Sequence, residues 1–168
     1  MIGNKTDDSY RWAEAIMTVR FDLEEGQLVD YIYPDDIFPE KLKKIIGYFS
    51  FPDSYVFSPE GELFYAFQLK FENEPLYCYS HFTQKKDPTN PRGYFQKSIV
   101  LVSKIRLIKI FKVVLKEINK LYFASNLDDT ILRRCLESLN SNPNPSLVVK
   151  ANEKFVVRLF ENEIKVPT

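Results

Sequence analysis

The side chains that most often transfer protons, attack substrates or ligate metals are scarce in this sequence. It contains 1 His and 2 Cys in 168 residues. The sequence gives no reason to place a catalytic Ser or Cys next to His81. We therefore interpret His81 as a structural or surface histidine. Cys78 and Cys135 are far apart and fit no metal-ligand spacing. This favours two free, buried thiols in a reducing compartment.

Motifs for hydrolysis or phosphate binding are also missing from the sequence. It has no glycine-rich phosphate loop, no Gly-x-Ser-x-Gly motif and no zinc-ligand spacing. The acidic segment Asp22–Asp36 does not follow the calcium-loop consensus, which favours a solvated hairpin. We therefore expect no catalytic residue, no metal ion and no cofactor, and a small enzyme is the least favoured interpretation.

Charge is segregated along the chain although the formal net charge is zero. Residues 1–40 hold ten acidic against three basic residues, a net charge of −7. Residues 104–120 hold six basic residues against one acidic residue, a net charge of +5. Because a nucleic-acid binder usually carries a positive surplus overall, we expect no nucleic-acid partner.

The lysines of the basic segment recur at helical spacing. Lys109, Lys112, Lys116 and Lys120 are separated by three, four and four residues, which places them on one side of a predicted helix. One interpretation is an ordinary amphipathic helix packed on a sheet. The other is attraction to an anionic membrane or an acidic partner, with each lysine contributing about 1 kcal/mol near such a membrane.

Composition indicates a globular protein that contains a β-sheet. Hydrophobic residues make up 45% of the chain and aromatic residues 15%. No apolar run approaches the roughly 20 residues that a membrane span needs. The polar N-terminal segment, Met1–Asp8, lacks the apolar region of a signal peptide, so we expect a cytoplasmic protein.

The spacing of apolar residues predicts an α/β (α+β) fold in the order ββαβββαα. Period-two alternation marks strands and period 3.6 marks helices. Short turns between strands favour antiparallel neighbours, and the first strand is expected to be half-buried. The expected strands are residues 14–23, 28–33, 63–71, 76–82 and 94–103, and the expected helices are 39–49, 105–122 and 127–139.

One core is expected to join the first and fifth strands to the long helix. In the short helix, Leu42, Ile45, Ile46 and Phe49 share a face that the spacing predicts to be apolar. The members predicted for the main core are Ala15, Met17, Val19, Phe21, Ile99, Leu101, Phe111 and Leu115.

Residues 141–146 mark a break in the chain, because two prolines stand among small polar residues there. We therefore predict one module over residues 1–140. Residues 141–168 are predicted to form a linker and a β-hairpin, in which Leu147–Lys150 pairs with Phe155–Phe160.

Three short segments carry a family resemblance. They are Phe21–Val29 (FDLEEGQLV), Ser50–Ser54 (SFPDS) and Arg92–Ser103 (RGYFQKSIVLVS). In this order and spacing they closely resemble the N-terminal (upstream) part of DENN-domain proteins. The resemblance covers roughly residues 15–140, and it is strongest to the subfamily in which all three motifs occur together.

The resemblance implies both a fold and a function. The N-terminal part of such proteins is a longin-like module, here a five-stranded, mainly antiparallel sheet with helices on its faces. Members of the family are guanine nucleotide exchange factors, which bind a Rab GTPase and promote GDP release in membrane trafficking. A DENN module that follows the first module would be a second partner. The expected location is cytoplasmic, with peripheral recruitment to endosomal membranes.

The motifs also imply a partner-binding site. Taken alone, the second segment is a helix end followed by a turn with Phe51 tucked inward as a core plug, and Gly93 serves a close backbone approach. The alternative function is a longin-type interaction or scaffold module without exchange activity. The residues implied in partner binding are Phe51, Pro52, Asp53, Ser54, Tyr94, Gln96 and Lys97.

Overall fold

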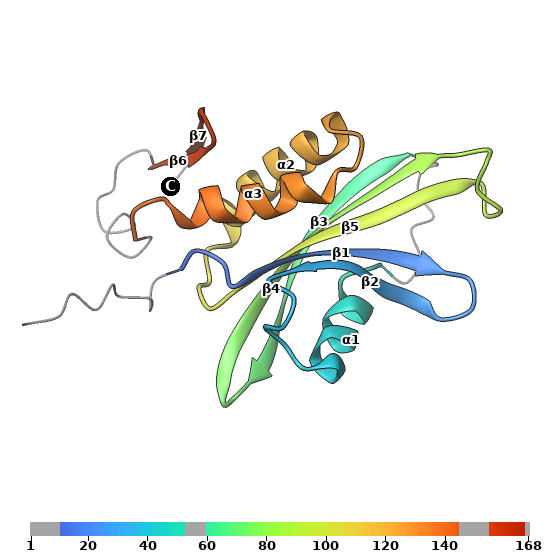
Figure 1. Ribbon diagram of the computed structural model, residues 1–168, viewed down its shortest axis with the longest axis horizontal. Coiled ribbons are helices and arrows are strands. Elements are labelled where there is room, and N and C mark those ends of the chain that lie inside the picture. The colour runs from blue at the N-terminus through green and yellow to red at the C-terminus, as the bar shows by residue number, and fades with distance from the viewer. Residues whose placement is uncertain (1–10, 53–59, 145–154, 167–168) are drawn as a thin grey trace, which may run out of the picture.

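The computed structural model describes residues 11–52, 60–144 and 155–166. Its centre is a five-stranded sheet in the order β2-β1-β5-β4-β3 (Figure 1). Every neighbouring pair of strands is antiparallel. The strands are β1 (Ala15–Asp22), β2 (Gly26–Tyr33), β3 (Gly61–Phe71), β4 (Glu74–Lys86) and β5 (Tyr94–Ser103).

Helices cover both faces of this sheet. Helix α2 (Ile108–Ala124) and helix α3 (Asp129–Asn140) lie on one face, and helix α1 (Glu40–Phe49) lies on the other (Figure 1). The N-terminus of α3 is capped by Asp128, whose side chain accepts a 3.0 Å hydrogen bond from the Thr130 amide. The predicted α+β fold and its order ββαβββαα are confirmed, and the architecture is consistent with a longin-like fold.

The apolar side chains form two cores, one on each face of the sheet, and not the single core predicted. Ile99, Leu101, Phe111 and Leu115 belong to the core under α2 and α3, as predicted. The other predicted members point the opposite way. Ala15, Met17 and Val19 belong to the core under α1, and Phe21 packs at its margin.

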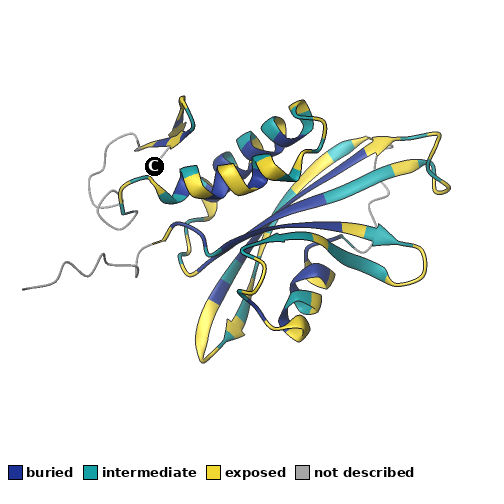
Figure 2. Ribbon diagram, viewed as in Figure 1, coloured by how far each residue is buried: buried dark blue, intermediate teal, exposed yellow. Residues whose placement is uncertain are grey.

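Strand β1 is buried on both faces, which corrects the prediction of a half-buried strand. Ile16 and Thr18, expected on an exposed face, are 0% exposed. Ile16 packs in the core under α2 and α3. The sheet interior appears dark blue in Figure 2 because helices cover both of its sides. A central strand of this kind shows period-two spacing without having a solvent face.

The apolar face predicted for α1 is only partly buried. Leu42 and Ile46 are buried, whereas Phe49 is 49% exposed and Tyr48 is 55% exposed. The Phe49 ring centroid lies 5.8 Å from that of Phe67 on β3. The last turn of α1 therefore presents aromatic side chains at the surface.

The C-terminal hairpin forms with a different partner from the one predicted. Strand β6 (Phe155–Leu159) pairs with β7 (Asn162–Val166), while the predicted partner at 147–150 lies outside the described residues. Val157, Leu159 and Ile164 join the core of α2 and α3. The turn between β6 and β7 consists of residues 160–161.

The described part of the predicted linker makes specific contacts. The Asn142 side chain makes two hydrogen bonds to the backbone of Arg158 in the hairpin. It donates to the Arg158 carbonyl (2.9 Å) and accepts from the Arg158 amide (2.8 Å). The Trp12 indole donates a 3.0 Å hydrogen bond to the Pro143 carbonyl. These bonds hold residues 142–143 against the helical layer and the start of the first strand.

Candidate partner-binding site

The three motif segments, far apart in the sequence, meet at one end of the molecule. The Arg92 guanidinium carbon lies 4.1 Å from the centroid of the Phe21 ring, a cation–π contact. The Phe21 ring in turn lies 6.2 Å, centroid to centroid, from the ring of Phe51. We call this region, formed by the β1–β2 turn, residues 50–52 and the β4–β5 connection, the motif end.

Phe51 anchors the motif end from within. It is 5% exposed and lies edge-on to Phe82 at a centroid distance of 5.0 Å. Its neighbour Ser50 is held by two bonds: the Ser50 amide donates to the Ile46 carbonyl (2.9 Å), and the Ser50 carbonyl accepts from the Ser80 hydroxyl (2.8 Å). Phe51 therefore shapes the surface by packing beneath it.

The β4–β5 connection is closed by backbone bonds around a glycine. The Asp87 amide donates to the Gly93 carbonyl (2.9 Å), and the Gly93 amide donates to the Asn90 carbonyl (2.8 Å). Gly93 has φ +79, and a Cβ placed there would meet nothing within 4 Å. The prediction of close backbone approach is wrong, because Gly93 is needed for its left-handed backbone conformation.

A row of side-chain amides and a guanidinium crosses the adjoining strands. The Arg92 guanidinium donates to the Gln96 side-chain oxygen (2.9 Å), and the Gln96 amide donates to the Gln84 side-chain oxygen (2.7 Å). Arg92 is thus held by both a ring and an amide. Gln96 supports Arg92 as part of this row.

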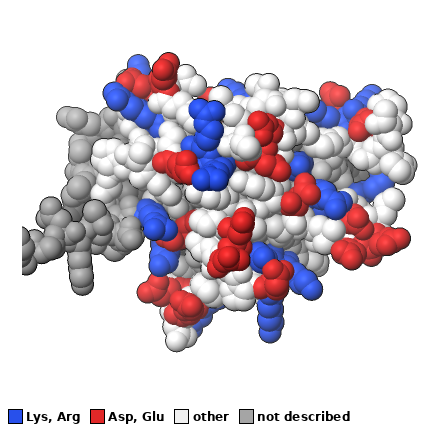
Figure 3. Space-filling view, viewed as in Figure 1, with Lys and Arg blue, Asp and Glu red and all other residues white. Residues whose placement is uncertain are grey.

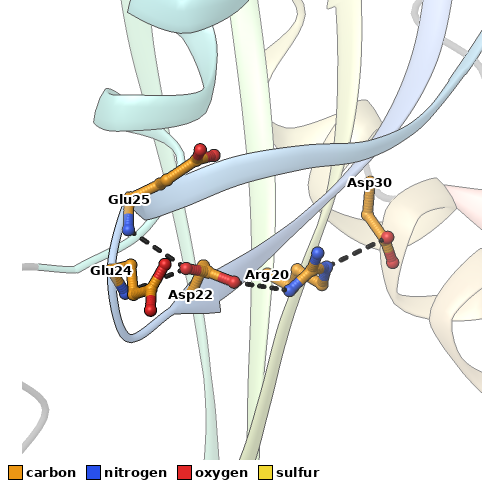
Figure 4. Close-up of polar contacts among 5 residues, drawn as sticks. All are labelled: Arg20, Asp22, Glu24, Glu25 and Asp30. Atoms are coloured by element: carbon orange, nitrogen blue, oxygen red, sulfur yellow. Dashed lines mark hydrogen bonds and ion pairs between the residues drawn. The ribbon is translucent and has the colours of Figure 1, made fainter.

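The β1–β2 turn supplies the acidic side of the motif end (Figure 4). The Asp22 carboxylate accepts bonds from the amides of Glu24 (2.9 Å) and Glu25 (3.0 Å), and it lies 3.5 Å from Arg20. The bond from the Glu24 amide is the largest cause that lowers the Asp22 pKa below its usual value. Acidic atoms gather at this turn in Figure 3, while charges of both signs alternate over the rest of that face.

An open pocket of about 480 Å³ lies between the two turns. Leu23, on its rim, is 66% exposed, and Tyr94 is 39% exposed. Such a mixture of apolar, aromatic and charged groups suits non-covalent binding of a protein surface. The pocket is lined by Arg20, Phe21, Asp22, Leu23, Glu24, Asn90, Pro91, Arg92, Tyr94, Phe95 and Gln96.

Lys97 points away from this pocket and toward α2. Its ammonium lies 3.0 Å from the Asp30 carboxylate and 5.5 Å from the centroid of the Tyr122 ring, and its side chain is 12% exposed. Burial alone would lower the Lys97 pKa, but interactions with Tyr122 and Asp30 raise it above its usual value. Lys97 therefore links the sheet to the helical layer.

The remaining predicted site residues flank the pocket or fall outside the description. Pro52 is half-buried next to Phe51, while Asp53 and Ser54 lie outside the described residues. Leu23 and Arg92 were not predicted as site residues, although both stand within or beside the quoted motifs. The sequence feature that could have identified Leu23 as a site residue is its apolar side chain next to the predicted hairpin turn.

Known proteins are similar in sequence to this chain over two thirds or more of its length. The chain is 37% identical over 121 residues to Protein DENND6 homolog of Dictyostelium discoideum, a match that covers 67% of this chain and 17% of that protein. It is 33% identical over 156 residues to human Protein DENND6B, covering 77% of this chain and 26% of that protein. The chain is a homologue of a segment of the DENND6 proteins.

Mouse Protein DENND6A is similar in the same way, at 36% identity over 141 residues, with 68% of this chain and 23% of that protein covered. No protein-family model matches the chain. The chain spans about a quarter or less of the length of these DENND6 relatives. They support the resemblance to DENN-domain proteins that the three motifs indicated.

Side chains that could ligate a metal do not gather in the described part of the chain. Among residues 11–52, 60–144 and 155–166, no three His, Cys, Asp or Glu side chains form a group able to hold a metal ion. Burial raises the pKa of both Cys78 and Cys135 to about 12. None of the described helices has the length and sustained apolar character of a membrane-spanning helix.

His81 lies beneath α2, on the opposite face of β4 from its neighbour Phe82, which packs against Phe51. His81 is 5% exposed, and its Nε2 atom lies 3.6 Å from a Glu62 carboxylate oxygen. Burial is the largest influence and lowers the His81 pKa below 6.5, assisted by Lys116 and opposed by Glu62. The imidazole is therefore neutral at pH 7, which agrees with the structural role inferred from sequence.

We expect acidification to destabilise the protein through His81. Above pH 6.5 the imidazole is neutral in both the folded and the unfolded state. Below that pH the His81 imidazole is protonated in the unfolded state and still neutral in the folded state. The free energy of unfolding therefore falls with pH until the pH reaches the lowered pKa of His81 in the folded state. Urea denaturation at about pH 7.5 and about pH 5.5 should show a smaller loss for His81→Gln than for the parent chain. Equal losses would contradict this assignment.

Proposed function

We propose that this chain is the N-terminal, longin-like lobe of a DENN-type exchange factor for a Rab GTPase. The observation that carries the proposal is the convergence of the three family motifs at the motif end. Residues 21, 51 and 92 are brought into one contact chain there, although they come from three separate elements. The residues that carry most of the energy of an interface cluster together, and the convergence of the motifs supplies one such cluster.

The exchange mechanism needs no covalent chemistry from this chain. An exchange factor lowers nucleotide affinity by binding more tightly to the GTPase conformation whose nucleotide site is open. The Rab GTPase itself carries the nucleotide and magnesium. The exposed side chains of the motif end provide three kinds of contact: apolar from Leu23, aromatic from Tyr94 and cationic from Arg92. The buried Phe51 holds this surface in place. We therefore propose a regulator of a GTPase with no catalytic residue or cofactor of its own.

We propose residues 1–140 as the longin-like module and residues 141–168 as a connection leading toward a DENN module. The hairpin in this connection packs on α2 and α3 through Val157 and Leu159. A following module would therefore begin next to the helical face. We propose Pro52, Tyr94 and Gln96 as partner residues at the motif end, with Phe51 supporting them from beneath and Lys97 supporting the strand from the side of α2. Asp53 and Ser54 stay proposed partner residues outside the described part of the chain.

A surface substitution at the motif end should reduce exchange without unfolding the protein. Leu23→Asp places a charge where an apolar contact is proposed, and its parent side chain is 66% exposed. We propose Leu23 as one of the few contacts that dominate an interface, whose loss costs about 1–2 kcal/mol, so we expect GDP release from the cognate Rab to slow about tenfold. The measurement is release of a fluorescent GDP analogue, screened over a Rab panel with the chain joined to its DENN module.

Ile108→Asp is the matched control for this substitution. Ile108 is 41% exposed and begins α2, at the opposite end of β5 from the motif end. It should leave GDP release unchanged. Equal release rates for the Leu23 and Ile108 variants, with unchanged thermal unfolding, would argue against the motif end as the Rab surface.

A second candidate function is a scaffold that attaches to an anionic membrane without exchange activity. The predicted lysine face of α2 is present: Lys109, Lys112, Lys116 and Lys120 are all exposed. Among them, only Lys120 has an ion pair within the described residues, 3.1 Å from Glu117. Salt-sensitive binding to anionic vesicles, together with no exchange on any Rab, would favour this function. We propose a cytoplasmic protein recruited to endosomal membranes in either case.

A further inference from the structure

Strand β3 forms an open edge of the sheet. It stands last in the strand order and pairs along all of Gly61–Phe71 with β4 on one side only. No other described strand borders it. The outward backbone groups of such an edge are a template for another strand, which proteins usually shield or deliberately use.

The side chains of β3 read as a self-complementary sequence about Ala66. If two copies of β3 lie antiparallel with Ala66 opposite Ala66, Glu62 faces the partner's Lys70 and Lys70 faces the partner's Glu62. The same register places Leu63 opposite Leu69 and Tyr65 opposite Phe67. Opposite charges and aromatic pairs directly across strands are the favourable combinations in an antiparallel sheet.

The charged and apolar positions of this register lie on different faces of the strand. Glu62 and Lys70 lie on the α2 face and are exposed. Leu63, Tyr65, Phe67 and Leu69 lie on the α1 face, where Leu63 is 38% exposed and Phe67 meets the exposed Phe49 ring. Pairing would therefore bury an aromatic row on one face and close two ion pairs on the other.

We propose that this chain forms a two-fold symmetric dimer in which β3 pairs with β3 of a second copy about Ala66. The two sheets then continue into one another. Under a two-fold axis, if Glu62 of one copy contacts Lys70 of the other, Lys70 of the first also contacts Glu62 of the second. Each favourable pair of different residues therefore occurs twice. The second copy is favoured as the occupant because the charge order of β3, acidic at one end and basic at the other, complements its own reverse.

The dimer is tested by sedimentation velocity on the full 168-residue chain across concentration. We expect a monomer–dimer equilibrium with Kd on the order of 10 μM. Lys70→Glu places a carboxylate opposite Glu62 at both symmetry-related positions. It should weaken dimerisation about tenfold or more, since like charges opposite one another destabilise a strand pair. It leaves the hydrogen bond from the Asn119 amide to Glu62 and the contact between Glu62 and His81 untouched.

A second variant separates repulsion from misfolding. Glu62→Gln combined with Lys70→Glu removes the like-charge pair while keeping an acceptor for the Asn119 amide. This double variant should dimerise more tightly than Lys70→Glu alone. Lys112→Glu, the same charge change on the exposed face of α2, should dimerise like the parent chain.

Three results would overturn the proposal. They are a parent chain that stays monomeric at about ten times the expected Kd, a dimer indifferent to Lys70→Glu, and a dimer equally sensitive to Lys112→Glu. A monomeric parent chain would leave the edge available to a strand from a different protein.

Discussion

Replacing Phe111 by alanine is expected to lower the free energy of unfolding by about 3–5 kcal/mol. Phe111 is 0% exposed at the centre of the core under α2 and α3. Its ring stacks on Tyr79 at a centroid distance of 4.3 Å and meets Trp12 edge-on at 6.3 Å. Truncation would remove contacts to both rings and leave a cavity in this core.

Phe49→Ala is the matched control because it removes the same side chain at a surface position. Phe49 is 49% exposed at the end of α1. We expect it to cost well under the Phe111 value, within about 1 kcal/mol, because about half of the Phe49 surface already meets solvent. Urea denaturation followed by circular dichroism measures both. Similar losses for the two variants would contradict the assigned burial of α2.

The second large effect concerns the chain as an isolated lobe. The relatives are much longer proteins, of which this chain covers about a quarter or less. In the proposed mechanism two lobes bind the GTPase. Association must first offset the loss of rigid-body freedom, a cost that does not shrink with the interface. Removing one of two lobes therefore weakens binding by far more than the fraction of the interface area that this lobe contributes. We expect the isolated chain to bind its Rab with Kd on the order of 10 μM or weaker.

GDP release should separate the isolated lobe from the joined protein most clearly. The 168-residue chain alone should barely accelerate release, whereas the chain joined to a DENN module should accelerate it strongly. Isothermal titration against the nucleotide-free Rab measures binding, and fluorescent GDP release measures exchange. Robust release by the isolated chain would refute the two-lobe mechanism, and an inactive joined protein would favour the scaffold.

The candidate site was predicted from the sequence only because three family motifs occur in it. The structure brings the three motif segments together through Phe21, Phe51 and Arg92, and their role in partner binding stays a prediction. Alternation along β5 separated Gln96 from Lys97, but it did not say which side chain meets the pocket. The structure places Gln96 beside Arg92 and turns Lys97 toward Asp30. That outcome depends on which sheet face the helices cover.

The sequence by itself determined the local structure. Period-two and period-3.6 spacing predicted the order of strands and helices, because each period reports which residues share a face. Gly26, with φ +79, marks the first turn as its sequence context predicts. The buried strand β5 was recognised over its full length, Tyr94–Ser103, from its apolar run.

Only the tertiary structure decided how these faces meet. Alternation in β1 cannot say which face meets α1 and which meets α2, because helices cover both sides of a central strand. The hairpin partner of Phe155–Leu159 and the exposure of Phe49 were likewise undetermined. Each of these depends on contacts between segments distant in the sequence, and local spacing carries no information about distant neighbours.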